Sequence, residues 1–254
     1  NEKDIFFLTL IIINIYTGFI FLKDPKLNNT ILFSLSSALA FDTRIMAFIP
    51  ITFILIFLSF KCMRSVLFFK KNLKFIIYYF IFTLAFILIF WPYLWHNPII
   101  NLLNLLEVID GADWSVNNFY LGEFILSSYV PWHYHIIWIL VTSPIVVILF
   151  FLLGSFFVLR RGLFRLINVN DDLNDIWRGD NEMLDLFFLL LTIICIIAFI
   201  MKGVGYSGWR HLYFIYPLII MTFLSGIYYL SIIFRTKLTI NLIYLLVVFN
   251  LSYL

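Results

Sequence analysis

Charged residues interrupt this largely apolar sequence of 254 residues at three places where they could do chemistry. The first is the run Asn1-Glu2-Lys3-Asp4, which directly precedes a long apolar stretch. At the mouth of a helix bundle, the carboxylate of Asp4 could act as a general base or hold a divalent cation. The alternative is an ordinary polar flank, in which Asp4 lies near a helix N-terminus and is favoured by the helix dipole.

The second cluster is Asp42-Thr43-Arg44, which lies between two apolar segments. A charged residue within a membrane costs roughly 2.5–3.5 kcal/mol on insertion scales, and it usually faces a cavity or a partner. Asp42 and Arg44 therefore either belong to a site or neutralise each other at the tip of a tight helical hairpin.

The third cluster, from Lys202 to His211, combines three glycines with two cations. The planar fork of Arg210 can donate two parallel hydrogen bonds to a phosphate, and a lipid phosphate at the membrane interface is the predicted counter-ion. The alternative is that Arg210 snorkels at a helix end. The glycine-rich stretch lacks the strand, the helix and the GKS or GKT ending of a nucleotide-binding loop.

His133 and His135 are separated by one residue, so on a helix their rings point to different sides. With Glu123 nearby, a metal site is one interpretation, and packing at the membrane interface is the favoured one. Nucleic-acid binding is not predicted, because the basic residues are spread over several loops rather than gathered on one face.

The elements that must position these residues are membrane helices. The chain is 63% hydrophobic and only 12% charged, with a mean hydropathy of +1.04, whereas soluble domains carry about 25% charged residues. Its continuous apolar runs are long enough to cross a hydrocarbon core about 30 Å thick, where the backbone must satisfy its own hydrogen bonds. The sequence therefore predicts an all-α membrane protein and excludes a soluble globular domain.

We expect one polytopic transmembrane helix bundle over residues 1–254, with seven to eight spans. The predicted spans are 5–22, 29–43, 46–60, 75–95, 134–158, 184–201 and 211–234, with a partial eighth from 238 onward.

Alternate loops hold 13 of the 17 lysines and arginines, so the positive-inside rule makes these loops cytoplasmic, among them 159–183. The long connection 96–133 carries acids and interfacial aromatic residues and is predicted to be extracytoplasmic. Its segment 99–109 is predicted to be amphipathic, along the membrane surface. Asp4, Arg44, Lys202 and Arg210 all fall on this opposite side.

Five strings resemble a known family when they are taken in order. They are NEKDIFF from Asn1, DTRI from Asp42, WPYLWHNP from Trp91, YVPWHY from Tyr129 and GWRHLYF from Gly208. Together they resemble bacterial members of the GT-C superfamily of polytopic glycosyltransferases. The nearest branch is the phospholipid-carrier-dependent, protein mannosyltransferase-like one (glycosyltransferase family 39), related to the aminoarabinose transferases of lipid A.

The resemblance implies an integral protein of the bacterial plasma (inner) membrane. Such a protein transfers a sugar from a polyprenyl-phosphate donor to a protein, lipid or glycan acceptor on the outer face. It implies no firm cofactor, although a divalent cation is compatible with it. The family's main catalytic Asp would precede Asn1, so we interpret the chain as an N-terminally truncated fragment that is inactive alone.

The resemblance also implies roles for single residues. Asp4 matches the family's second acidic position, and Arg210 matches the position that holds the lipid phosphate. Lys202 and Arg44 are weaker candidates for the same role, and His211 and Tyr213 belong to the same substrate-binding string.

The main alternative function is a transporter or flippase for a lipid-linked or anionic substrate, with Arg210 and Asp4 lining its path. Transporters often contain paired repeats and broken helices near the midplane, and the sequence has no apparent repeat. A glycan polymerase or ligase that uses the same lipid donors, or a purely structural membrane subunit, is a further alternative.

Overall fold

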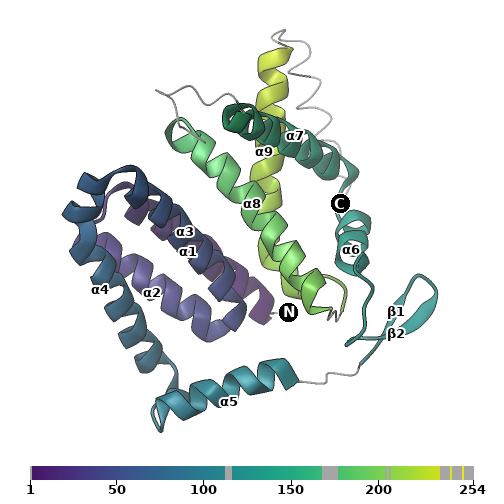
Figure 1. Cartoon of the computed structure of the whole chain (residues 1–254). Coiled ribbons are helices and arrows are strands. Elements are labelled where there is room, and N and C mark those ends of the chain that lie inside the picture. The colour runs from purple at the N-terminus through teal and green to yellow at the C-terminus, as the bar shows by residue number, and fades with distance from the viewer. Residues whose placement is uncertain are drawn as a thin grey trace. The chain divides into compact units, whose positions relative to one another are not determined.

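The computed structural model of the chain describes residues 2–111, 116–167, 177–203, 205, 207–234, 241 and 248 (Figure 1). The chain divides into two compact units, Asn1–Trp114 and Ser115–Leu254, which we call unit 1 and unit 2 and treat separately. The prediction of one bundle over the whole chain stays a prediction.

The secondary-structure elements in the described part of unit 1 are all helices. Its elements are α1 (Glu2–Lys23), α2 (Leu27–Thr43), η1 (Ile45–Ala47), α3 (Phe48–Arg64), α4 (Val66–Phe90), η2 (Pro92–Leu94) and α5 (Pro98–Gly111). The helix α5 confirms that the predicted amphipathic segment 99–109 is helical.

Unit 2 begins with a short hairpin and continues with helices. Its elements are β1 (Asn117–Tyr120), β2 (Glu123–Leu126), α6 (Tyr134–Thr142), α7 (Ile145–Ile167), α8 (Gly179–Lys202), η3 (Arg210–Ile215) and α9 (Tyr216–Ile233). The strands are antiparallel, and Leu121 and Gly122 form the turn with positive φ angles of 51° and 93°.

The structure confirms the predicted all-α membrane class, since six helices in its described part are long and apolar enough to cross a membrane. This number falls short of the predicted seven to eight spans, since α2, in the predicted span 29–43, has 17 residues and is not among the six. The predicted span 134–158 is broken between α6 and α7 at Ser143 and Pro144, where proline lacks the N–H that a continuous helix needs. The partial eighth span lies almost entirely outside the described residues.

Several helices extend into segments predicted to be loops. The Ser65 side chain accepts a hydrogen bond from the Phe68 amide and caps α4, so Lys70, Lys71 and Lys74 lie in this helix. Likewise α7 and α8 enter the predicted loop 159–183 from both sides, which leaves its two ends helical.

Polar side chains join the helices of unit 1. Asn14 of α1 donates to the hydroxyls of Ser37 and Ser36 in α2, at 2.8 and 3.2 Å. The Tyr79 hydroxyl of α4 donates to Ser37 at 3.1 Å, and its ring stacks on that of Phe33. All five residues are buried, so these bonds fix the register of α1, α2 and α4 inside the unit.

A close crossing joins α7 and α9 in unit 2. A Cβ atom on Gly154 would overlap the carbonyl oxygen of Thr222, and one on Gly226 would overlap the carbonyl oxygen of Phe150. Small residues at such positions let two helix backbones approach directly, which is a common means of association in membranes.

Candidate functional site

The ionisable residues of unit 1 lie at its two ends. Arg44 directly follows the last residue of α2 and has an extended backbone. Its guanidinium donates to the carboxylate of Asp4, which lies in the first turn of α1. At the other end of α1, the Lys61 ammonium of α3 donates to the Leu22 carbonyl at 2.5 Å. The predicted Asp4 and Arg44 candidates therefore share one end of the unit, and the connections α1–α2 and α3–α4, which we call the lysine-rich turns, lie at the opposite end.

The Asp4–Arg44 ion pair is largely shielded from solvent. The side chains are 7% and 20% exposed, respectively, and the Arg44 guanidinium lies 5.5 Å from the ring centre of Phe7. This pairing corrects the alternative in which Arg44 neutralises Asp42, because the ion-pair partner of Arg44 is Asp4, forty positions earlier in the chain. The charge of Arg44 is thus balanced within the protein.

The glycine-rich segment of unit 2 is held by backbone hydrogen bonds. Gly203 ends α8 in the left-handed conformation, with φ of 64°. Its carbonyl accepts from the Val130 amide at 3.3 Å, and the Gly205 amide donates to the Ser127 carbonyl at 3.0 Å. Asn118 of the hairpin donates to the Gly205 carbonyl at 2.7 Å. The segment is therefore fixed onto the hairpin and the turn that follows it.

Glycine is required where this segment meets α6. A Cβ on Gly205 would stand 2.7 Å from the Tyr134 ring, and Gly208 has φ of 70°. The Gly208 amide donates to the Tyr134 hydroxyl at 3.1 Å, and the Trp209 indole donates to Thr142 at 2.8 Å. These contacts fix the point at which η3 and its substrate-binding candidates begin.

The candidates of unit 2 fall on both sides of the glycines. Lys202 is exposed at the last residue of α8, and Arg210 and His211 open η3 with partly buried side chains. Tyr213 is exposed, and its ring stacks on Tyr216 with centroids 5.9 Å apart. The four predicted residues thus flank one loop, at the end of α8 and in η3, while their association with Asp4 and Arg44 stays a prediction.

The histidines have packing roles in the structure. His133 Nδ1 and the Tyr120 hydroxyl share a hydrogen bond at 2.7 Å, and His135 is buried edge-on against Phe199. Burial raises the pKa of the Tyr120 phenol, and the nearby phenol of Tyr134 adds to the rise. Tyr120 therefore stays protonated at neutral pH as a partner for His133. In the described part of the chain, no three His, Cys, Asp or Glu side chains converge as metal ligands.

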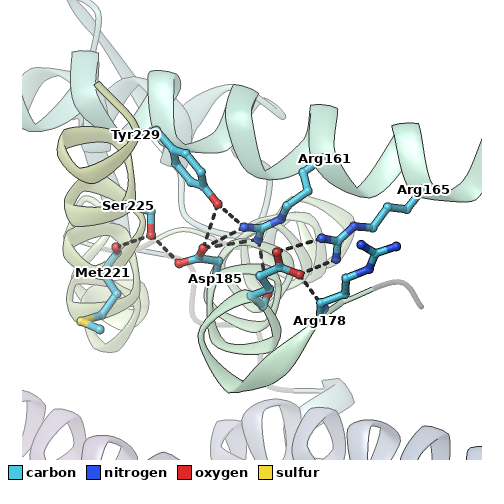
Figure 2. A network of polar contacts seen from close by, with 8 residues as sticks. Arg161, Arg165, Arg178, Asp185, Met221, Ser225 and Tyr229 are labelled. Atoms are coloured by element: carbon cyan, nitrogen blue, oxygen red, sulfur yellow. Dashed lines mark hydrogen bonds and ion pairs between the residues drawn. The ribbon is translucent and has the colours of Figure 1, made fainter. Parts of the chain in front are cut away.

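A second polar network, at the other end of unit 2, was not predicted (Figure 2). Asp185 of α8 accepts from Ser225 at 2.6 Å and pairs with Arg161 of α7 at 3.3 Å. Arg161 also donates to the Tyr229 hydroxyl. Beside it, the guanidinium of Arg165 binds both carboxylate oxygens of Glu182. These interactions join α7, α8 and α9.

The sequence contained a signal for this network. Asp185 stands within an apolar helix, where an ionisable residue usually has a partner. Arg161 and Arg165 are four residues apart, and Glu182 and Asp185 are three apart, so each pair lies on one helix face. Assigning the arginines to the cytoplasmic loop 159–183 concealed this match.

Comparisons of this chain with family models, with curated proteins and with solved structures find no match.

Proposed function

We propose that this chain is the membrane-embedded part of a glycosyltransferase that takes a sugar from a polyprenyl-phosphate donor. The acceptor, a protein, lipid or glycan, receives the sugar on the extracytoplasmic face. The family resemblance of the five sequence strings motivates the proposal, and the distribution of charge within each unit is the observation that carries it.

In unit 1, Asp4 and Arg44 lie at the end away from the lysine-rich turns. In unit 2, the glycine-rich segment and Arg210 lie at the end of α8 away from the arginines near its start. If the basic ends are cytoplasmic, both groups of candidates face the extracytoplasmic side. A transferase needs its base and its phosphate ligand on one side of the membrane.

Arg210 is the proposed phosphate ligand. Transfer with inversion requires a base for the acceptor hydroxyl and a cation that stabilises the departing lipid phosphate. Arg210 follows a loop that is fixed at both flanks, so its backbone is positioned before the donor binds. Lys202, His211 and Tyr213 flank the same loop in the chain, and in this proposal they contribute to binding the headgroup.

Asp4 and Arg44 act as a pair in this proposal. The Arg44 guanidinium already binds the Asp4 carboxylate, so part of its hydrogen-bonding capacity is used within the protein. An ionised carboxylate has about four lone-pair sites, so Asp4 can accept from an acceptor hydroxyl or bind a divalent cation in addition to Arg44. The role proposed for the pair is therefore to act on the acceptor.

Replacing Arg210 tests the donor side. In the full-length protein, Arg210→Ala is expected to lower turnover of a polyprenyl-phosphate sugar at least tenfold, about 1.4 kcal/mol. Arg160→Ala is the matched control, because Arg160 is exposed in α7, near the other end of unit 2. Transfer of labelled sugar in membrane vesicles measures the effect. Unchanged turnover in a folded Arg210→Ala protein would remove Arg210 from the site.

Replacing Asp4 tests the acceptor side. Asp4→Asn keeps the size of the side chain and removes its charge, so transfer is expected to fall while donor binding is kept. Asp24→Asn serves as the control, since Asp24 is exposed at a turn. Normal transfer by Asp4→Asn would leave Asp4 with a structural role alone.

The same vesicles distinguish a transporter or flippase. Such a protein would move the lipid-linked sugar across the bilayer without forming a glycosylated product. Movement without product would contradict the proposed transferase, and product formation that depends on Arg210 would support it.

A further inference from the structure

A cavity of about 610 Å³ opens at the arginine-rich end of unit 2. It lies beside α8 and α9, and Arg161 of α7 contributes to its wall. Its polar lining includes Arg161, Arg178, Glu182, Asp185 and Ser225. The cavity is about twenty times the volume that one water occupies in the liquid, roughly 30 Å³, so it can hold part of a larger molecule.

The two acids of the lining are already neutralised. Asp185 accepts from Ser225 and pairs with Arg161. Both oxygens of Glu182 are bound by Arg165, and one also accepts from the backbone amide of Arg178. Arg161 and Arg165 therefore neutralise Asp185 and Glu182, so neither carboxylate is available to attract a cation.

Arg178 supplies the remaining charge. Its side chain is exposed and lines the cavity. Figure 2 shows that the dashed line at Arg178 ends on its backbone nitrogen and that none reaches its guanidinium. The three arginines and two acids of the network sum to one positive charge, and the described residues offer the Arg178 guanidinium no hydrogen bond or ion pair. The cavity thus presents a cation with its donors available.

Besides Asn181 and two tyrosines, the rest of the wall is apolar. Leu184, Phe188, Met221, Leu224 and Ile232 line the cavity, and Leu224 and Ile232 are 47% and 43% exposed. These side chains belong to helices that are long enough to span a membrane, so their exposed surface faces lipid chains more favourably than water. One cavity therefore offers both a cation and an apolar surface.

We propose that this cavity binds a membrane phospholipid with an anionic headgroup, whose phosphodiester contacts Arg178 while its acyl chain lies along Leu224 and Met221. Basic pockets between transmembrane helices bind anionic lipid headgroups on the cytoplasmic side, and the arginine-rich loop is the side that the positive-inside rule makes cytoplasmic. This site lies at the opposite end of α8 from the glycine-rich segment and does not depend on the proposed transferase activity.

Native mass spectrometry of the full chain in detergent tests the site. The probes are dioleoyl phosphatidylglycerol, which is anionic, and dioleoyl phosphatidylcholine, which has no net charge. Arg178→Gln is expected to reduce phosphatidylglycerol occupancy about fivefold and to reduce phosphatidylcholine occupancy less, because the choline cation of that lipid offsets the charge of its phosphodiester. Arg160→Gln is the matched control, because it removes an exposed arginine from the same region that does not line the cavity. It should leave both occupancies unchanged.

A second variant tests the apolar wall independently of charge. Leu224→Trp fills the cavity from its exposed edge and should also lower phosphatidylglycerol occupancy. An equal loss in Arg178→Gln and Arg160→Gln would reveal unspecific attraction, and no loss in either Arg178→Gln or Leu224→Trp would overturn the proposal. Inorganic phosphate at the lipid's concentration should not compete; if it displaced the lipid fully, the site would be one for free phosphate.

Discussion

Both units join helices through polar side chains, and unit 2 adds a direct crossing of two helix backbones. In unit 1, buried hydroxyl and amide groups of α1, α2 and α4 bind one another. In unit 2, α7 and α9 cross at Gly154 and Gly226, where their backbones approach directly. Both solutions answer the same problem, because lipid chains are as apolar as leucine and no hydrophobic force pulls helices together inside a bilayer.

The difference teaches where each unit tolerates change. A hydrogen bond between membrane helices contributes on average about 0.6 kcal/mol, so a network of several can lose one and persist. A direct backbone crossing has no flexible side chain that can move aside, so one added branch forces the helices apart. We therefore expect unit 2 to be the less tolerant unit at its helix crossing.

The largest effect is expected for Gly154→Leu, which should destabilise unit 2 by about 3 kcal/mol, as overpacking of an interior does. Cys195 is fully buried in α8, so the rate at which a thiol-specific dye labels it in a Cys62→Ser background reports opening of the unit. Gly162→Ala is the matched control in α7, since a Cβ there would meet no atom within 4 Å. Fast labelling of Cys195 in Gly162→Ala, or slow labelling in Gly154→Leu, would contradict the expected intolerance of the α7–α9 crossing.

A smaller effect is expected for Asp185→Ala, about 2 kcal/mol. The substitution leaves Arg161 shielded from solvent and without its carboxylate partner, which is destabilising. Both side chains are partly exposed, at 18% and 22%, so the loss is smaller than for a fully buried ion pair. Asp24→Ala is the control, because the Asp24–Lys26 pair is more than half exposed and should contribute nothing measurable. Thermal unfolding in detergent checks both. If Asp185→Ala lowered the unfolding temperature no more than Asp24→Ala, the network of unit 2 would give no stability.

The smallest effect is expected for Asn14→Ala, about 1 kcal/mol, which is the sum of two interhelical hydrogen bonds. Part of this loss is offset, because the Asn14 side-chain oxygen is buried and accepts no hydrogen bond from the described residues. Tyr16→Phe is the control, since that ring is 66% exposed on the same helix. A loss as large as that of Gly154→Leu would show that polar groups hold unit 1 as rigidly as the backbone crossing holds unit 2.

The sequence predicted the helical membrane class because that property depends on composition and on the length of apolar runs, which are local. The same argument located α1, α3, α8 and α9 to within a few residues. It missed the hairpin, although Gly122 between two aromatic strands is a turn signal. It also missed the break at Pro144, because hydropathy continues across a proline that ends a helix.

For the candidate site, the sequence singled out Asp4, Arg44 and Arg210 as charged residues at the ends of apolar segments. The sequence by itself determined that these charged residues need partners, because an isolated charge is costly in a membrane. Only the tertiary structure decided which partners they have. Arg44 pairs with Asp4 rather than Asp42, and Arg161 pairs with Asp185, because ion pairs form where helix faces meet, and which faces meet is set by packing over the whole unit rather than by spacing along the chain.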